Sequence, residues 1–332
     1  MIRLIVPMET DPAANPKNLV QPELSAVESL LYHEVGCSRE FIAKMCSHLL
    51  ESGGKRFRPL LVLLSGRCFQ PPDKELIAVA AAAELIHMAS LAHDDVIDQS
   101  ENRRGKATLN HLWDNRTAVL SGDFLFAKAF ALLAASKHFP ILSIMVNAIQ
   151  DMCEGEVEQA LQIFNPNQSE QHYLQRTEKK TAKLIAACCQ AGAIIGQAQP
   201  PLISALGDYG LNLGLTFQIA DDILDYTGDP DSLGKPIYQD LASGNYTLPI
   251  LFLLKDKKER QWLTQVMAKG QLTSTSTEQI STVLKNSGAI DYCYAKAYEC
   301  RDRAKAALQV VPDSLYREML LQLADLAVTR IN

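Results

Sequence analysis

The chain has 332 residues, of which 47% are hydrophobic and 21% are charged, and this is the composition of a globular protein with a large core. The formal net charge of −6 argues against broad nucleic-acid binding, which needs a basic surface. Because no low-complexity linker divides the chain, we expect a single domain over residues 1–332.

The cysteines and the apolar segments indicate a soluble, cytoplasmic protein. Eight cysteines are present and none forms a C-x-x-C pair, so they are expected to be reduced thiols rather than zinc or redox ligands. The short apolar run at residues 1–9 lacks the length and cleavage site of a signal peptide. No apolar stretch is read as reaching the ~20 residues that span a bilayer, so we expect no stable membrane insertion.

The hydrophobic pattern is helical almost throughout, and no segment alternates convincingly like a strand. Glycines, prolines and aspartates make residues 227–245 the most loop-like stretch, which we interpret as a functional loop. Asp73 is expected to cap one long helix, and Thr275 with Glu278 predicts a capping box for another. The expected fold is all-α, a many-helix bundle around a central cavity. The clearest helical segments are residues 38–52, 73–98, 168–196 and 279–308.

One acidic pattern occurs twice, as H-D-D-V-I-D at residues 93–98 and as A-D-D-I-L-D at residues 220–225. On a helix, carboxylates at positions i, i+1 and i+4 fall within about a 100° arc, so each set projects from one face. Carboxylates that face one another repel unless cations lie between them, and oxygen ligands of this kind suit Mg²⁺. The predicted metal ligands are Asp94, Asp95, Asp98, Asp221, Asp222 and Asp225.

Two basic clusters accompany the acidic ones. R-R-G-K follows the first acidic motif at residues 103–106, and G-G-K-R-F-R-P occupies residues 53–59 at a glycine-rich helix junction. The planar fork of arginine suits bidentate contacts with phosphate, and lysine adds a point charge. Two acidic and two basic clusters match two diphosphates, one held through metal ions and the other held directly.

These motifs resemble those of the trans-isoprenyl (polyprenyl) diphosphate synthases, especially medium- and long-chain members such as heptaprenyl or octaprenyl diphosphate synthases. The similarity runs from about residue 49 to residue 249, through G-G-K-R-F-R-P, E-L-I-H, H-D-D-V-I-D, R-R-G, G-D-F-L, K-K-T-A, F-Q-I-A-D-D-I-L-D, L-G-K and T-L-P. It implies the isoprenoid synthase fold and a Mg²⁺-dependent prenyltransferase. Such an enzyme condenses isopentenyl diphosphate onto an allylic diphosphate after metal-assisted ionisation.

The resemblance also implies individual roles. Asp94, Asp98 and Asp221 correspond to the main magnesium ligands, and Asp95, Asp222 and Asp225 to residues that orient waters or add ligands. Thr181 and Gln218 would lie beside the developing allylic cation, where an oxygen dipole is useful. The allylic diphosphate would be bound by Arg103, Lys180 and Lys235. The isopentenyl diphosphate would be bound by Lys55, Arg58, His87 and Arg104.

Two stretches depart from the family pattern. Many members carry lysine after the glycine in G-K-x-T-L-P, and this chain has Asn245, which removes a cation from the allylic side. Tyr238 and Gln239 replace the small residues often found after the L-G-K lysine, with no consequence that the sequence reveals.

Product length is expected to depend on the residues one turn before the first aspartate pair. Farnesyl synthases commonly have a bulky aromatic residue at one or both positions, whereas this chain has Ala89 and Ser90. Small side chains leave an apolar tunnel open, which predicts a hexaprenyl to octaprenyl product. Phenylalanine at either position is expected to shorten it.

Several alternatives remain open on the sequence. The product could be shorter, as in farnesyl or geranylgeranyl synthases, or the chain could be a non-catalytic subunit of a heteromeric synthase. A terpene cyclase would not need the second basic site. The E-x-x-H pattern at Glu84 and His87 also fits a di-metal carboxylate bundle, although no second copy of it is found. The resemblance implies a homodimer, with a heteromer containing a helper subunit as the alternative.

Overall fold

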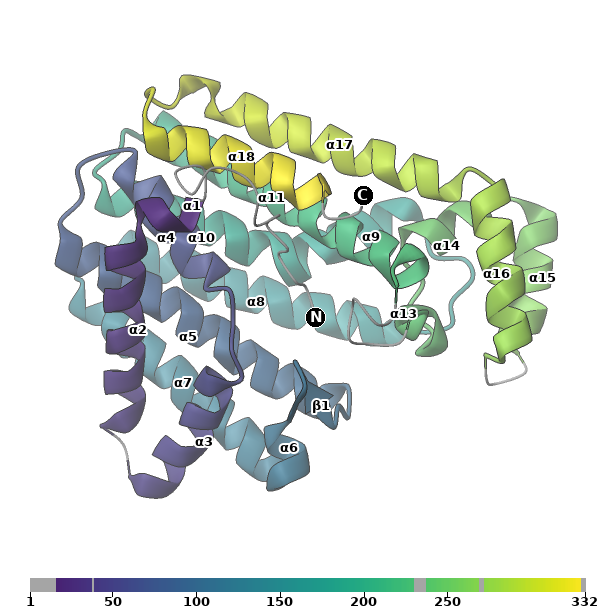
Figure 1. Ribbon diagram of the computed structural model, residues 1–332, viewed down its shortest axis with the longest axis horizontal. Helices are drawn as coiled ribbons and strands as arrows, with labels where there is room; N and C mark the ends of the chain where they lie inside the picture. Colours follow the sequence, from purple (N-terminus) through teal and green to yellow (C-terminus); the bar gives the residue numbers. More distant parts are fainter. Residues whose placement is uncertain (1–15, 38, 230–236, 269–271, 330–332) are drawn as a thin grey trace.

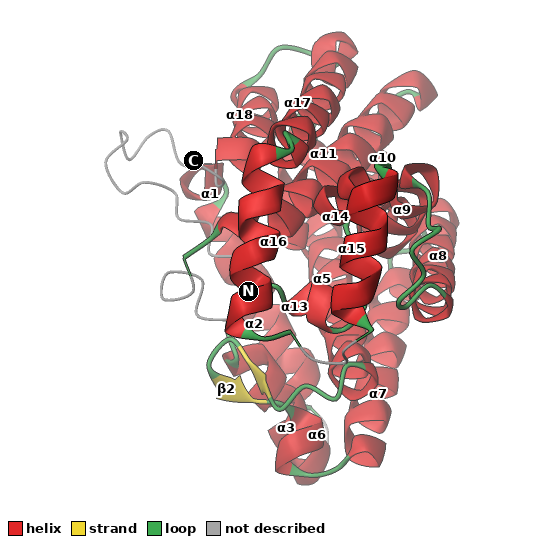
Figure 2. Cartoon of the chain, turned by 90° about the vertical axis from the view of Figure 1, so that its right-hand side faces the viewer, coloured by secondary structure: helices red, strands yellow, loops and turns green. Residues whose placement is uncertain are grey.

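The computed structural model describes residues 16–37, 39–229, 237–268 and 272–329. Helices make up nearly all of the described chain, which confirms the all-α fold (Figures 1 and 2). Up to residue 161 the helices are α1 (Pro16–Leu19), α2 (Gln21–Gly36), α3 (Glu40–Glu51), α4 (Phe57–Arg67), α5 (Asp73–Ile97), α6 (Leu109–Leu112), α7 (Asn115–Ala135) and α8 (Phe139–Leu161).

The second half of the chain is equally helical. Its elements are α9 (Glu170–Thr177), the π-helix η2 (Glu178–Ala182), α10 (Lys183–Ile195), α11 (Pro200–Thr227), α13 (Gln239–Ala242), α14 (Leu248–Leu253), α15 (Lys257–Met267), α16 (Ser274–Asn286), α17 (Ala289–Ala307), the 3₁₀-helix η3 (Leu308–Val310) and α18 (Leu315–Thr329). In Figure 1, α17 and α18 run along the upper side, and α15 and α16 form the right-hand end.

Four helices, α4, α5, α10 and α11, form the centre of the bundle. Helix α5 packs against α4 and α7, while α10 packs against α4, α8 and α11. Small side chains allow these helices to approach closely: Ala80–Ala83 are fully buried. At the crossing of α4 and α10, a Cβ on Gly192 would lie 2.3 Å from the carbonyl oxygen of Val62, so only glycine fits there.

The segment predicted as one helix over residues 168–196 is a continuous helical run of α9, η2 and α10. Its middle five residues, Glu178–Ala182, form a π-helix. Segments of π-helix are rare and are frequently found at functional sites. Lys180 and Thr181, for which the family resemblance implies a role, both lie within this π-helix.

A short hairpin corrects the expectation that no strand is present. Asn102–Arg103 (β1) pairs antiparallel with Lys106–Ala107 (β2). The two residues between them, Arg104 and Gly105, have φ values of 55° and 75°. Two consecutive left-handed residues give the type I′ turn that favours two-residue hairpins, so the R-R-G-K cluster folds on itself.

Two predicted helix caps were wrong. Asp73 is the first residue of α5 rather than its cap, and its carboxylate pairs with Arg67 at 2.6 Å. Helix α16 begins two residues earlier than predicted, and its capping box joins Thr273 and Ser276 instead of Thr275 and Glu278. A capping residue contributes only about 1 kcal/mol to the stability of a helix, so tertiary contacts decide which of several neighbouring residues becomes the cap.

Two helices are long and apolar enough to span a membrane by length and composition alone, contrary to the expectation from the sequence. One is α5. Its most apolar 18-residue stretch is 67% buried inside the protein, as in the core helix of a soluble protein. The other is α7, whose corresponding stretch is only 33% buried. The outer face of α7 is therefore left largely exposed by the described residues.

Candidate active site

Helix α5 ends at the first acidic motif, with Asp98 as its C-terminal cap. The pKa of Asp94 is raised to about 6, first because the carboxyl is buried and next because Glu156 places a negative charge near it. Asp98 adds to the repulsion, while Lys180 and Arg103 act in the opposite direction. A carboxylate in such surroundings is stabilised when a cation approaches it.

The second acidic motif lies near the C-terminal end of α11. Asp222 is buried, and its carboxylate accepts hydrogen bonds from the Tyr173 hydroxyl at 2.6 Å and from the Gln218 amide at 2.9 Å. Asp225 is also buried and accepts from two backbone N–H groups at the start of α13, both at 3.3 Å. These two carboxylates therefore hold α9, α11 and α13 together.

Asp95, in the first motif, has a comparable structural partner. Its buried carboxylate accepts a hydrogen bond from Nε of Arg103 at 2.7 Å. This ion pair ties the β1–β2 hairpin to the end of α5. Sequence analysis assigned Asp95 to metal binding and Arg103 to the allylic diphosphate. In this ligand-free structure the two side chains pair with each other.

The six aspartates thus divide into two groups of three. Asp95, Asp222 and Asp225 bond to other parts of the protein. The side chains of Asp94, Asp98 and Asp221 make no hydrogen bond or ion pair with any residue that the structure describes. Carboxylates without a protein partner are the ones left to bind a metal ion, and these three are the main ligands that the family resemblance implies.

Thr181, Gln218 and Lys180 lie together on η2 and α11. The Thr181 hydroxyl donates to the Gln218 side-chain oxygen at 3.0 Å, which confirms that the two lie side by side. Lys180 pairs with Glu156 of α8 at 2.5 Å and donates to Gln159 at 3.2 Å. Gln218 is therefore bonded at both ends, to Thr181 and to Asp222, so its orientation is fixed.

Electrostatic contacts connect the two acidic ends. The charge of Glu156 raises the pKa of Asp94, and the same charge acts on Arg176 of α9. After burial, the charge of Asp222 has the largest effect on the pKa of Arg176. Glu156 therefore acts on Asp94 of the first motif, and Glu156 and Asp222 of the second motif both act on Arg176, which links the two acidic helix ends electrostatically.

A pocket beside the first motif contains much of the predicted isopentenyl diphosphate site. It is lined by His48, Arg56, Glu84, His87, Arg103 and Arg104, together with apolar residues of α3 and α5. The pKa of His87 is lowered well below its usual value, first by burial and then by the neighbouring arginines. His87 is therefore neutral near pH 7, and Nδ1 is buried without a hydrogen-bond partner among the described residues. Its imidazole remains available for a ligand.

Arg58 and Lys55, the other predicted residues of that site, are partly exposed at the start of α4. Burial lowers the pKa of Arg58, and the charges of Glu84 and Asp94 oppose this effect. Nε of Arg58 is buried and has no hydrogen-bond partner among the described residues. The charges that act on Arg58 thus come from Cys188 of α10, from Glu84 and from Asp94 of the first acidic motif.

Arg56, in the middle of the same basic cluster, stabilises the fold. Its guanidinium donates to Glu84 at 3.1 Å and to both carboxylate oxygens of Glu28 at 2.9 and 3.1 Å. One carboxylate oxygen of Glu84 therefore accepts a hydrogen bond from this arginine. Among the residues that the structure describes, no three carboxylate, histidine or cysteine side chains are grouped to hold a metal, and no second E-x-x-H partner for Glu84 and His87 is found there.

Comparison with known proteins decides the family. The family model described as polyprenyl synthetase matches residues 39–284. The chain belongs to the polyprenyl synthetase family. It is 38% identical to heptaprenyl diphosphate synthase component 2 of Geobacillus stearothermophilus, over 92% of this chain and 95% of the relative. The catalytic class follows from the family: this polyprenyl synthetase is a prenyltransferase of isoprenoid biosynthesis.

Solved structures agree with this assignment. A decaprenyl diphosphate synthase from Rhodobacter capsulatus matches with a TM-score of 0.90 and 35% identity, covering 97% of this chain and 100% of that chain. A polyprenyl synthase from Caulobacter crescentus, described as complexed with calcium and isoprenyl diphosphate, matches with a TM-score of 0.90 and 36% identity over 98% and 100%. The names of matched proteins range from geranylgeranyl to decaprenyl synthases, so the family alone does not fix product length.

Three residues that interact with the predicted site residues were not assigned by sequence analysis: Tyr173, Arg176 and Glu156. Tyr173 lies seven residues before Lys180, which is about two helical turns and therefore the same face. That spacing could have identified the tyrosine. Glu156 and Arg176 carry no comparable pattern, because only tertiary packing brings them to the site.

The predicted product-length residues differ in accessibility. Ser90 is partly exposed and lies one turn before Asp94 on the same face of α5, and its hydroxyl bonds to the His87 carbonyl oxygen at 2.9 Å. Ala89 is fully buried. Of the two positions, Ser90 is the one that a growing chain could contact.

The three positions after the second acidic motif are only partly described. Lys235 lies outside the described residues. Tyr238 is buried in a left-handed conformation with φ of 62°, and its ring packs edge-on against Tyr226. Asn245 donates a hydrogen bond to the Asp240 carboxylate at 3.2 Å. The departure at residue 238 thus fills core space, and the departure at residue 245 places a neutral side chain beside a carboxylate.

Proposed function

We propose that this polyprenyl synthetase condenses isopentenyl diphosphate with an allylic diphosphate in trans geometry, to a product of hexaprenyl to octaprenyl length. The observation that carries the proposal is the separation of two kinds of site. Asp94, Asp98 and Asp221 have no hydrogen-bond or ion-pair partner among the described residues, and a pocket with arginines and a neutral histidine lies beside the first acidic motif. Two diphosphates with different modes of binding match this arrangement.

The donor set fits Mg²⁺. Asp94, Asp98 and Asp221 offer only oxygen ligands, and the pKa of Asp94 is raised by burial and then by the negative charges of Glu156 and Asp98, which a cation would offset. Among the described residues, no three carboxylate, histidine or cysteine side chains are grouped closely enough to hold a metal ion by themselves. Mg²⁺ usually takes one or two carboxylates from the protein and further ligands from substrate phosphates. When bound, Mg²⁺ would neutralise the allylic diphosphate as a leaving group.

The residues of the chain would bind and orient the substrates around that leaving group. Because the Thr181 hydroxyl donates its proton to Gln218, its oxygen lone pairs remain to face a developing positive charge. Neutral His87 can offer a hydrogen bond but no charge, so Arg58 and Arg104 would supply the positive charge for isopentenyl diphosphate. Holding both substrates in position contributes to the rate by proximity.

Incubation of the purified chain with isopentenyl diphosphate, farnesyl diphosphate and Mg²⁺ tests this function. The expected result is elongation to products beyond geranylgeranyl length. The heptaprenyl relative is named as a component of its enzyme, so a non-catalytic or dependent subunit is the second candidate. No elongation by the chain alone would favour that candidate, and cyclised products without diphosphate would favour a terpene cyclase.

Ser90→Phe is expected to shorten the product, because an aromatic ring one turn before Asp94 would block the path of the growing chain. Chromatography of the dephosphorylated products measures the change. Ser90→Ala serves as the control and is expected to leave product length unchanged. Ala89→Phe is a poorer probe, since overpacking a fully buried site costs about 1–3 kcal/mol. The tunnel hypothesis fails if Ser90→Phe gives the same product lengths as the unmodified chain.

We propose that a second copy of the chain covers the outer face of α7. Val119 and Leu120 are 38% and 55% exposed on this apolar helix. A helix face of this kind can pack against itself across a two-fold axis. Light scattering is expected to give a dimer mass, and Leu120→Glu is expected to give a monomer. A monomeric unmodified chain that binds lipid vesicles would instead assign the face to a membrane.

A further inference from the structure

Arg176, on α9, is a buried cation that has no direct counterion among the described residues. Its side chain is only 5% exposed. Arginine is almost never buried unless it is paired. Yet no residue that the structure describes forms an ion pair or a hydrogen bond with its guanidinium group. An unpaired buried guanidinium is costly for the folded protein, and a bound anion would compensate that cost.

The surroundings of Arg176 show where such an anion would bind. Burial lowers the pKa of Arg176, and the charges of Asp222, Asp240 and Glu156 act against this effect. These carboxylates come from α11, α13 and α8, so the buried guanidinium lies among the charges around the second acidic motif. Tyr173, one turn earlier on α9, lies beneath it with the ring centroid 5.8 Å away.

Asn245 contacts Asp240, one of the carboxylates that act on Arg176, and it lacks the positive charge that many family members have at this position. Its side-chain amide donates to the Asp240 carboxylate at 3.2 Å, and its backbone N–H donates to the Asp240 carbonyl at 2.8 Å. Asp240 therefore contacts Asn245 and also acts electrostatically on Arg176. Oδ1 of Asn245 is buried without a hydrogen-bond partner among the described residues. A cation is absent at residue 245 and present at residue 176.

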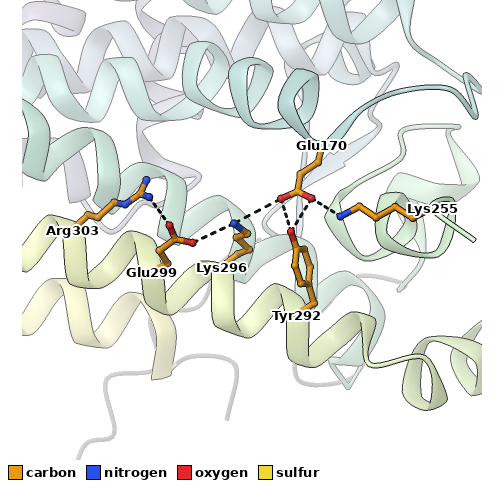
Figure 3. Close-up of polar contacts among 6 residues, drawn as sticks. All are labelled: Glu170, Lys255, Tyr292, Lys296, Glu299 and Arg303. Carbon is orange, nitrogen blue, oxygen red and sulfur yellow. Dashed lines mark hydrogen bonds and ion pairs between the residues drawn. The ribbon is translucent and has the colours of Figure 1, made fainter.

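Helix α9 holds Arg176 in a fixed position. Figure 3 shows Glu170, in the first turn of α9, bound by the Tyr292 hydroxyl at 2.7 and 2.8 Å and by Lys255 at 2.7 Å. One turn later, Tyr173 donates to Asp222 at 2.6 Å. The first turn and the middle of the helix are thereby anchored, to α17 and to α11. A preorganised cation loses little freedom when it binds a ligand.

We propose that Arg176 binds the diphosphate of the allylic substrate beside Asp221 and Asp222, and supplies the positive charge that Asn245 does not. The proposal rests on the proposed function, because it takes the second acidic motif as the allylic site. The planar guanidinium can form two parallel hydrogen bonds with a phosphate, which a lysine at residue 245 could not. The competing explanation is structural: Arg176 only balances the carboxylates of Asp222, Asp240 and Glu156.

Steady-state kinetics of four variants separates the two explanations. Arg176→Gln is expected to raise KM for farnesyl diphosphate about 10- to 100-fold, the effect of losing a charged hydrogen bond. KM for isopentenyl diphosphate is expected to change less than about twofold. Arg176→Lys, which keeps the charge, is expected to lose less. Asn245→Lys added to Arg176→Gln is expected to restore most of the loss, and Asn245→Lys alone is expected to lower KM for farnesyl diphosphate.

Binding of inorganic pyrophosphate in the presence of Mg²⁺, measured by calorimetry, gives a readout that does not depend on turnover. Arg176→Gln is expected to weaken binding by the same factor, with recovery in the double variant. Unchanged pyrophosphate binding, or an equal rise in KM for both substrates, would overturn the proposal. If Arg176→Gln does not fold, the Asn245→Lys variant tests the proposal by itself. Asn245→Lys is then expected to bind pyrophosphate more tightly than the unmodified chain, and unchanged binding would overturn the proposal. Absence of elongation by the unmodified chain would count against the proposed function instead.

Discussion

Asp94→Asn is expected to lower kcat/KM about a thousandfold, because it removes a carboxylate that has no described protein partner and is proposed to bind Mg²⁺. Metal ions stabilise a developing charge by several kcal/mol, and each 1.36 kcal/mol corresponds to a tenfold change in rate. Steady-state assays with isopentenyl and farnesyl diphosphates measure the loss. Asp302→Asn, at an exposed carboxylate of α17, is the matched control and is expected to keep full activity.

Asp94 also predicts a pH dependence for metal binding. Its pKa is about 6 in the metal-free protein, above the ordinary value of 3.8. The folded chain therefore binds a proton there more tightly than the unfolded chain, so this group makes the metal-free protein less stable as pH rises from about 4 to 6. Mg²⁺ competes with that proton, and its affinity is expected to fall below pH 6. Calorimetry that finds the same pH profile in Asp94→Asn would contradict a role for Asp94 in binding.

The repeated acidic motif was predictable because its geometry is local. Carboxylates at positions i, i+1 and i+4 share a face of any helix, so sequence alone placed all six at two helix ends. Which of them bind metal depends on distant partners. Asp222 is occupied because Tyr173, 49 residues earlier, donates to it. The resemblance supplied the division into main and secondary ligands, and the described contacts give that division a physical reason.

The basic cluster at residues 53–59 contains two arginines whose different contacts could not be predicted from the sequence. Arg56 and Arg58 are two residues apart and chemically identical, and both belong to this basic cluster, but only Arg58 was assigned to isopentenyl diphosphate. Arg56, however, has a φ of 51°, and its guanidinium pairs with Glu28 and Glu84. Arg58 lies in the first turn of α4. A left-handed residue before a helix cannot be inferred from an arginine, since glycine and asparagine usually occupy that conformation.

The buried ion pair of Arg56 and Glu84 predicts the largest change in stability. Arg56→Met is expected to lower the free energy of unfolding by about 3–5 kcal/mol, because it leaves the Glu84 carboxylate buried and without its partner. Thermal unfolding monitored by circular dichroism is expected to show a Tm lower by roughly 10 °C, given the usual scaling with size. The exposed pair of Arg303 and Glu299 provides a control: Arg303→Met is expected to cost less than about 1 kcal/mol.

A double variant separates the orphaned charge from the lost packing of Arg56. Glu84→Gln removes the negative charge while it keeps the shape, so Arg56→Met combined with Glu84→Gln is expected to regain more than half of the lost stability. If the single and double variants unfold at the same temperature, the cost comes from the contacts of Arg56 with Glu28 and with the Leu50 carbonyl oxygen instead. Recovery would establish that this arginine of the basic cluster neutralises a buried carboxylate, which leaves Arg58 and Arg104 for the proposed contact with isopentenyl diphosphate.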